Sequence, residues 1–350
     1  MRVLVTGLGT FWGSRLAQAL EQLPEVELVV GVDTREPRLP LARTEFVKAD
    51  ASYTILRRMV RATQVDTVLH THLEVDSTRT NSRRLHEVNV IGTMNVLAAA
   101  AAEGSAVSKV VLKASTLIYG SNFADPYFFR ETQRRTHPAA TPVERSLVEV
   151  DALVGDFAQD HPEVAVTSLR FANVLGDDVT TVFSSMLRMP VVPEVFGYDP
   201  RLQFVHEDDV TRALAHATTG HQRGTFNVAG PGTITWSEAC RAVARRRLAM
   251  PPVFTGAARL PLRFLRVIDI PPEVLSLLRY GRGVDTSAFV DTGFEYAYTT
   301  PATVEAFAKA RRLERVVGTP PEYAYERDVE DFLRNSRAVV RPEGSLTTPS

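Results

Sequence analysis

The stretch "VLVTGLGTFWGSRLAQAL" (residues 3–20) joins a short apolar run to a segment of helical period through a glycine-rich turn. The turn carries Gly7, Gly9 and Gly13, with Thr10 between the last two. Glycines between a strand and a helix let the backbone turn tightly and approach a pyrophosphate held at the helix N-terminus. The stretch therefore predicts a dinucleotide-binding unit at the start of the chain.

An acidic residue stands at the spacing that such a unit requires. Asp33 follows Gly13 by twenty residues, near the end of the next apolar run, "ELVVGVDTR". A carboxylate at this place accepts hydrogen bonds from the adenosine ribose and repels a 2′-phosphate, which predicts NAD rather than NADP as the cofactor. Arg35, two residues later, adds a positive charge that weakens this preference. The alternative is a plain turn followed by an ordinary surface aspartate.

Apolar runs and segments of helical period alternate through the first half of the chain. Such alternation indicates a parallel sheet covered by helices on both faces. The expected fold class is α/β, a Rossmann-type doubly wound parallel sheet with a smaller C-terminal lobe. The predicted strands cover residues 3–6, 26–32, 45–47, 67–69, 109–112 and 164–169. The predicted helices cover residues 12–23, 53–63, 83–103 and 143–160.

Beyond residue 176 the pattern breaks into shorter segments spaced by prolines, such as "RMPVVPEVFGYDP". This change predicts an NAD-binding domain over 1–175, rejoined by about residues 204–230, and a substrate-binding lobe over 176–335. The last residues, 336–350, have no periodicity and are predicted to be a disordered tail.

The composition excludes several classes of protein. The chain has 350 residues, of which 44% are hydrophobic and 23% charged, and its formal net charge is −1. A nucleic-acid partner would require a basic face, so none is expected. A single cysteine, Cys240, excludes an intrachain disulfide. The chain shows no signal region and no apolar run long enough for a membrane span, which predicts a cytoplasmic protein.

Further stretches follow in a fixed order. "VKADAS" carries Asp50, "VDTVLHTHL" carries His70 and His72, and "NVIGTMNVLAAA" carries Asn89. "VVLKASTLIYG", "VTSLRFANVLG" and "FVHEDDV" come after them. Over about residues 1–315 the chain resembles the extended short-chain dehydrogenase/reductase family, in its NAD-dependent epimerase/dehydratase group. Within that group it is most similar to actinobacterial proteins described as UDP-glucose 4-epimerase-like.

The resemblance implies cofactor contacts. It places Asp33 at the ribose and Asp50 at the adenine, and it brings His70, His72 and Asn89 near the cofactor. Thr10 stands where the family has its middle glycine, so its side chain either crowds the pyrophosphate or donates a hydroxyl to it. The two histidines could share one strand face as metal ligands do, but no cysteine or further histidine lies nearby in the chain, and no metal site is predicted.

The resemblance also implies a catalytic trio, of which one member is present. The family's Ser/Thr corresponds to Ser115. Its Tyr-x-x-x-Lys falls on "TPVERSL", where Val143 and Leu147 replace the two residues, and none of the nine tyrosines has a lysine four positions later. General acid–base catalysis contributes roughly 10²–10⁴-fold to a rate. The sequence therefore predicts weak or no standard activity.

Four side chains remain as surrogate proton-transfer groups: Tyr127, Glu144, His72 and Lys113. Each also has a purely structural interpretation.

In the second half of the chain the resemblance implies substrate contacts at Asn173, Arg201 and Gln203, although Leu202 replaces the family's arginine there.

The expected function is that of a nucleotide-sugar epimerase-like protein that binds NAD and a small-molecule substrate. The alternatives are a non-catalytic NAD-binding sensor or scaffold, and an oxidoreductase of altered chemistry. Family members commonly dimerise through the helices that correspond to 83–103 and 143–160, so a homodimer is expected. The apolar positions of both helices, including Val143 and Leu147, are expected to supply part of that interface.

Overall fold

The structure is a computed structural model that describes residues 1–77, 80–250 and 270–317. The chain divides into two compact units, Met1–Ala308 and Lys309–Ser350, and the sites discussed below lie in the first. The predicted disordered tail lies outside the described residues, as does part of the predicted substrate lobe. Within the described residues, no helix combines the length and the apolar character needed to cross a bilayer.

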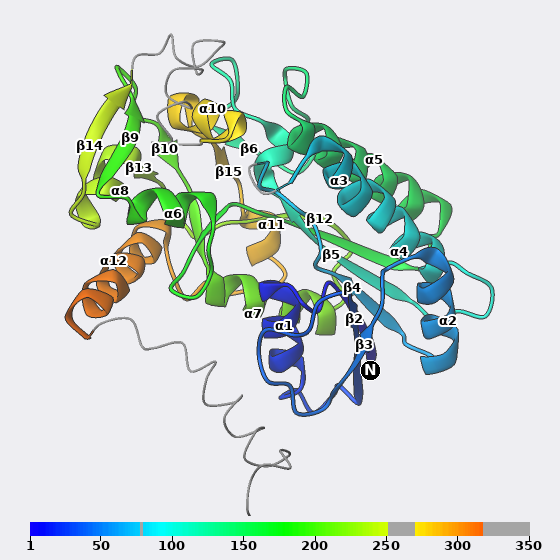
Figure 1. Cartoon of the computed structure of the whole chain (residues 1–350). Helices are drawn as coiled ribbons and strands as arrows, with labels where there is room; N and C mark the ends of the chain where they lie inside the picture. Colours follow the sequence, from blue (N-terminus) through cyan, green and yellow to red (C-terminus); the bar gives the residue numbers. More distant parts are fainter. Residues whose placement is uncertain (78–79, 251–269, 318–350) are drawn as a thin grey trace, which may run out of the picture. The chain divides into compact units, whose positions relative to one another are not determined.

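A seven-stranded sheet forms the centre of the first unit, with all its strands parallel and the order β12-β7-β5-β4-β1-β2-β3 (Figure 1). This arrangement confirms the predicted doubly wound α/β fold. The edge strand β12 lies late in the sequence and pairs with β7. The strands are β1 (Arg2–Thr6), β2 (Leu28–Asp33), β3 (Thr44–Lys48), β4 (Thr67–His70), β5 (Lys109–Ser115), β7 (Ala165–Phe171) and β12 (Gly224–Val228).

Helices cover both faces of this sheet, and each face has its own apolar cluster. One cluster joins α2 and α5 to the sheet through side chains such as Leu56 and Val150. The other joins α1 and α7 to the opposite face through Leu16 and Val210. The first face carries α2 (Tyr53–Thr63), α3 (Ser82–His86), the π-helical turn η1 (Glu87–Ile91), α4 (Gly92–Ala100) and α5 (Pro142–Asp160). The second face carries α1 (Phe11–Leu20), α7 (Glu207–Thr219) and α11 (Ser287–Val290).

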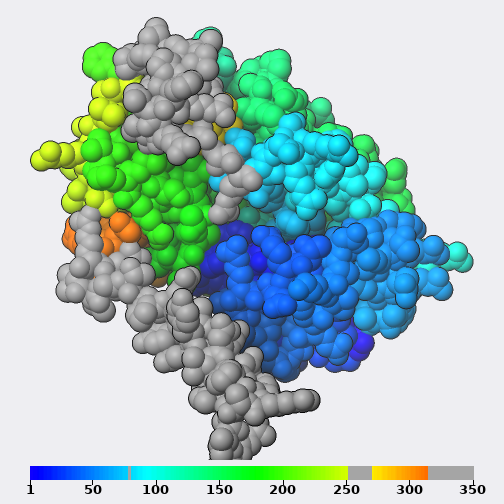
Figure 2. Space-filling view, viewed as in Figure 1, coloured from blue at the N-terminus to red at the C-terminus, as the bar shows by residue number. Residues whose placement is uncertain are grey.

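A third cluster, centred on Trp236 and Phe204, holds together the later elements. In Figure 2 the blue and cyan N-terminal residues adjoin the green residues of this region. Its helices are α6 (Val182–Arg188), α8 (Trp236–Ala242), α10 (Pro272–Tyr280) and α12 (Thr300–Val317). Its strands and those at its border form four two-stranded pairs: β6 (Phe128–Phe129) with β15 (Gly283–Val284), β8 (Asn173–Leu175) with β11 (Phe204–His206), β9 (Val191–Val195) with β14 (Arg246–Met250), and β10 (Arg201–Leu202) with β13 (Ile234–Thr235).

The predicted helix over 83–103 is present as one helical segment, residues 82–100, with a wider turn in its middle. It consists of α3 and α4 separated by the wider turn η1. The Thr93 hydroxyl donates a 2.6 Å hydrogen bond to the carbonyl of Asn89 inside this turn, and such side-chain bonds compete with the regular helical pattern. The turn carries Asn89, whose side chain is completely buried.

Candidate functional site

The glycine-rich turn is built as a tight connection between β1 and α1. Gly7 has a φ of +81°, a conformation that side-chain-bearing residues rarely adopt. A Cβ on Gly13 would lie 2.1 Å from the carbonyl oxygen of Gly7, so only glycine fits there. Thr10 caps α1: its hydroxyl donates to the Gly7 carbonyl at 2.7 Å and accepts from the Gly13 N–H at 3.0 Å. The Thr10 hydroxyl is therefore bound inside the turn.

Asp33 is fixed at the end of β2 and is only 5% exposed. Its Oδ2 accepts a hydrogen bond from the backbone N–H of Gly9 at 3.1 Å, and its Oδ1 accepts one from the N–H of Arg35 at 3.0 Å. The guanidinium of Arg35 is more distant, with Nε 3.9 Å from Oδ1. The two backbone bonds hold the carboxylate beside the glycine turn.

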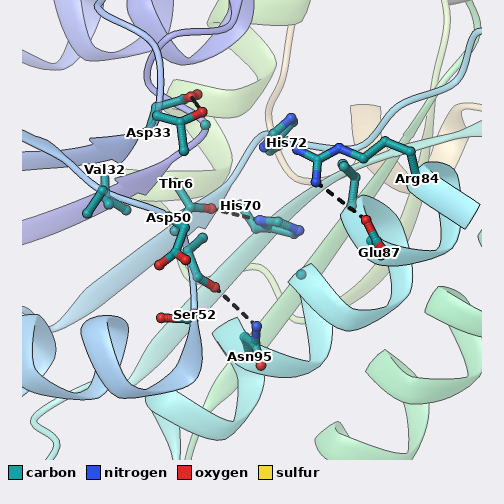
Figure 3. Close-up of a pocket in the computed structure, with 16 residues that line it drawn as sticks. Thr6, Val32, Asp33, Asp50, Ser52, His70, His72, Arg84, Glu87 and Asn95 are labelled. Carbon is teal, nitrogen blue, oxygen red and sulfur yellow. Dashed lines mark hydrogen bonds and ion pairs between the residues drawn. The ribbon is translucent and has the colours of Figure 1, made fainter. Parts of the chain in front are cut away.

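A cavity of about 200 Å³ opens next to Asp33, at the carboxyl ends of the parallel strands (Figure 3). This is the place where open α/β sheets bind their ligands. Figure 3 shows the carboxylates of Asp33 and Asp50 on one side and His72 with Arg84 on the other. Five of the nine predicted cofactor residues line the cavity: Gly7, Asp33, Asp50, His70 and His72.

Arg84 is a lining residue that the sequence did not indicate. It comes from α3, and its Nη1 lies 3.6 Å from Glu87 Oε2. Arg84 lies beside His72, opposite the two carboxylates, and its ion-pair partner Glu87 lines the same cavity. In the sequence Arg84 is one of several charged residues of a helical segment, and nothing in its spacing indicates that it lines a binding cavity.

The two histidines of the cavity differ in their surroundings. The ring of His70 is held between the hydroxyls of Thr6, 2.7 Å from Nδ1, and Thr93, 3.2 Å from Nε2. Burial, with a contribution from His72, lowers the pKa of His70 to about 3. Burial also lowers the pKa of His72, helped by Arg35 and Arg84 and opposed by Asp33. His70 is therefore a neutral, structurally bound ring, whereas His72 is half-buried at the cavity wall.

Asn89 does not line this cavity. Its Oδ1 accepts from the Glu74 N–H at 2.7 Å, and its Nδ2 donates to the Glu74 carbonyl at 2.8 Å and to Ser146 Oγ at 3.0 Å. Every hydrogen-bonding atom of the amide is thus engaged between the loop after β4 and helix α5. The expected cofactor contact of Asn89 stays a prediction.

Val143 and Leu147, which the sequence motif aligns with the family's tyrosine and lysine, are both inaccessible to solvent. Val143 is 0% exposed and Leu147 3% exposed, and both belong to the apolar cluster between α5 and the sheet. Ser115, at the end of β5, is half-buried and accepts a hydrogen bond from the Leu117 N–H at 3.2 Å. Of Ser115, Val143 and Leu147, only Ser115 has a group that can exchange a proton.

The four side chains considered as surrogate proton-transfer groups lie in different surroundings. Glu144 Oε2 accepts from the backbone N–H groups of Ala140 and Thr141 at 2.8 and 3.0 Å, which commits it to the cap of α5. Tyr127 is 61% exposed, on the loop that precedes β6. His72 lies in the dinucleotide cavity.

Lys113 is the remaining surrogate and is nearly fully buried on β5. Burial, opposed by Glu74, lowers the pKa of Lys113 to about 8. The Lys113 Nζ lies 5.1 Å from the ring centre of Trp12 and 5.7 Å from that of Phe171. These rings place the ammonium between the first turn of α1 and the end of β7.

The three predicted substrate residues do not form one site. Asn173 Nδ2 donates to the Gln203 carbonyl at 3.0 Å, and Gln203 Oε1 accepts from the Val284 N–H at 2.7 Å, so both side chains bind the protein itself. Arg201 is exposed and lines a separate cavity of about 600 Å³. Successive strand residues point to opposite faces, and Leu202, not Arg201, faces the apolar core.

Comparison with known proteins gives a family and a fold. The model of the NAD-dependent epimerase/dehydratase family matches residues 3–229. An uncharacterized protein of Mycobacterium tuberculosis is 32% identical over 321 residues, which cover 90% of this chain and 85% of that protein. UDP-glucuronic acid decarboxylase 6 of Arabidopsis thaliana is 24% identical over 275 residues, or 72% of this chain and 76% of the plant protein.

Two solved structures resemble this chain along most of its length. MoeE5 in complex with UDP-glucose and NAD superposes with a TM-score of 0.67 and 20% identity, covering 90% of this chain and 100% of MoeE5. UDP-glucose 4-epimerase of Thermotoga maritima, with UDP-glucose, gives a TM-score of 0.68 and 19% identity, covering 90% of this chain and 100% of the epimerase chain. At this identity the similarity is one of fold. The family resemblance expected from the sequence motifs is confirmed by the family match.

Proposed function

Because this chain belongs to the NAD-dependent epimerase/dehydratase family, we propose that it binds NAD together with a nucleotide sugar but lacks the family's standard proton-transfer pair. MoeE5 and the Thermotoga maritima epimerase are each described with UDP-glucose, which supports a UDP-sugar as the substrate class.

The glycine turn and the cavity fit an NAD molecule. A Cβ at Gly13 would collide with Gly7, so glycine keeps the turn tight, and a pyrophosphate would lie beside the Thr10-capped N-terminus of α1. Asp33 would hold the adenosine ribose, and Asp50 lies where the adenine would bind. Arg84 and His72 lie on the other side and would face the negative phosphates. When bound, NAD supplies a hydride acceptor for a sugar carbon.

The observation that carries the proposal is the burial of Val143 and Leu147 in the apolar core. Neither side chain can transfer a proton, and Glu144 is engaged by two backbone N–H groups. Ser115 alone cannot lower the pKa of a substrate hydroxyl as a neighbouring cation does. The expected behaviour is therefore binding with little turnover, as in a sensor or scaffold.

A second candidate function rests on Lys113. A lysine whose pKa is about 8 can exchange a proton near neutral pH, and Lys113 lies two residues before Ser115 on the same strand. An oxidoreductase of altered chemistry would use this pair in place of tyrosine and lysine. Its activity would be lost in Lys113→Met.

The direct test analyses what the purified protein binds. Mass and absorbance spectra of nucleotides released by denaturation should reveal NAD, and incubation with UDP-glucose or UDP-galactose should give little epimer and little NADH. Fast epimerisation that survives Ser115→Ala and Lys113→Met would contradict both candidate functions. Absence of NAD binding would contradict the cofactor assignment.

A further inference from the structure

Strand β5 carries two buried lysines, one near each of its ends. Lys109 stands at the start of the strand. Its Nζ donates to the carbonyl of Thr218 at 3.0 Å and to that of Gly220, so its charge is engaged at the C-terminus of α7. Lys113 stands near the carboxyl end of β5, and its charge has different surroundings.

Aromatic rings flank the ammonium of Lys113. Trp12, in the first turn of α1, and Phe171, at the end of β7, both have their ring centres within 6 Å of Nζ, at 5.1 and 5.7 Å. Such rings attract a cation but do not neutralise it. The acid that acts on Lys113 is Glu74, through its charge and not through a hydrogen bond. Lys113 is thus a buried cation held mainly by aromatic side chains.

This cation lies on the path that a dinucleotide takes across the sheet. The strand order changes direction at β1, with β2 and β3 on one side and β4 and β5 on the other (Figure 1). A Rossmann-type sheet binds the two halves of a dinucleotide across this point. Since Asp33 at the end of β2 marks the adenosine half, the nicotinamide half belongs over the ends of β4 and β5. Lys113 is two residues from the end of β5, beside the first turn of α1.

The two redox forms of NAD differ in charge at the nicotinamide ring. The oxidised ring of NAD⁺ carries a positive charge, whereas the reduced ring of NADH is neutral. A nearby like charge disfavours the charged form of a group, and the low dielectric around buried groups strengthens the effect. An ammonium at this position therefore repels the ring of NAD⁺ and leaves that of NADH unaffected.

We propose that the buried ammonium of Lys113 makes the dinucleotide site select NADH over NAD⁺. The inference rests on the proposed function, because it requires that the site binds this cofactor. It gives Lys113 a role that does not depend on proton transfer with Ser115. It also names the signal that a non-catalytic sensor of this kind would read, the ratio of NADH to NAD⁺.

This selection should fade as the pH rises. Burial, opposed by the charge of Glu74, lowers the pKa of Lys113 to about 8. The positive ring of NAD⁺ would lower it further, so binding of NAD⁺ should release protons from the wild type near this pH, whereas binding of NADH should not. Well above pH 8 the neutral amine no longer repels NAD⁺, and the two affinities should approach one another.

The test compares three ligands by calorimetry on the full chain: NAD⁺, NADH and ADP-ribose, which lacks the nicotinamide. We expect Lys113→Met to reduce the preference for NADH over NAD⁺ at pH 7 by about tenfold, which corresponds to one pKa unit of interaction. Any change in ADP-ribose affinity measures what Lys113 does to the rest of the dinucleotide. Lys113→Arg, which stays charged, should keep the preference at every pH.

The matched control is Lys109→Met, which removes the other buried lysine of β5 and should leave the affinity ratio unchanged. Thermal melts verify that each variant folds. Calorimetry in buffers of different ionisation enthalpy gives a second readout, because Lys113→Met should release fewer protons than the wild type when NAD⁺ binds.

Two results would overturn the role of Lys113: the same ratio of NADH to NAD⁺ affinity in the wild type and Lys113→Met, or an equal change of that ratio in Lys109→Met. In both cases the ligands still bind, so the proposed function stands. A wild type that binds none of the three ligands would instead contradict the proposed function, and this inference with it.

Discussion

The backbone N–H of Gly9 donates a 3.1 Å hydrogen bond to Asp33 Oδ2, so the glycine turn and the acid at the end of β2 hold one another in place. The carboxylate does not have to move into position when a ribose arrives. Its negative charge also lies beside the glycine turn, so we expect this side chain to affect both the affinity for a dinucleotide and the choice between NAD and NADP.

Asp33→Ala should remove the preference for NAD over NADP. The wild type is expected to bind NAD more tightly, because the carboxylate accepts ribose hydroxyls and repels a 2′-phosphate. Loss of a charged hydrogen-bond partner weakens binding by roughly ten- to a hundredfold. Calorimetry with both dinucleotides measures this, and Asp160→Ala, at the exposed end of α5, is the control. Equal affinities of the wild type for NAD and NADP would contradict the role given to Asp33.

Val143→Tyr combined with Leu147→Lys should restore part of the missing proton-transfer machinery. Each single change should restore less activity than the pair, because a phenol without a nearby cation keeps a pKa of about 10. The matched control is Val143→Phe with Leu147→Met, which adds similar bulk but no titrating group. Epimerisation of UDP-galactose is the readout.

The same two positions are core positions, so the double variant should also lose stability. Overpacking a filled core costs about 1–3 kcal/mol, and a buried ammonium adds to this. Denaturant unfolding of the double variant and its control gives the loss. If the control gains as much activity as the Tyr/Lys variant, the proton-transfer argument is wrong.

We predict a homodimer in solution, but with a different set of contacts than the sequence suggests. Val143 and Leu147 are buried within the chain and cannot reach a partner. The apolar side chains that these helices leave exposed are Ile91, Met94 and Val148, at 37, 45 and 37%. Met94→Lys should lower the mass measured by light scattering at tens of micromolar protein, whereas Phe123→Lys, on an exposed loop, should not. A monomeric wild type contradicts the prediction.

Lys113→Met should stabilise the fold at neutral pH. The folded-state pKa of about 8 lies below the unfolded value of about 10.4, so the buried ammonium opposes folding by up to about 3 kcal/mol. As the pH rises from 8 towards 10.4, the folded lysine loses its proton first, and the wild type gains stability relative to the variant. Urea titrations at several pH values measure this difference. A difference that does not change over this range would mean that Lys113 is not desolvated.

Local sequence patterns predicted the sheet because strand and helix alternate at regular spacing. The helix over 53–63 has the predicted bounds, and Gly7, Gly13 and Asp33 lie in the turn and strand end that the motif requires. The π-helical turn η1 could not be predicted, because Asn89 within it bonds to residues 15 and 57 positions away.

The residues of the candidate sites could be predicted from the sequence only in part. Arg84 reaches the dinucleotide cavity only through the way α3 packs. Arg201 and Gln203 were placed by alignment with a motif. Arg201 is exposed at a cavity and Gln203 accepts from the Val284 N–H, and their contact with a substrate stays a prediction.

The amide of Asn89 also determines how this part of the molecule can open. Since its Oδ1 holds the N–H of Glu74 and its Nδ2 holds Ser146 of α5, that backbone N–H is shielded from solvent as long as this bridge persists. Exchange of its proton for deuterium requires the bridge to break. The deuterium uptake of the Glu74 N–H therefore measures how often the loop after β4 separates from η1, the turn whose Asn89 also binds Ser146 of α5.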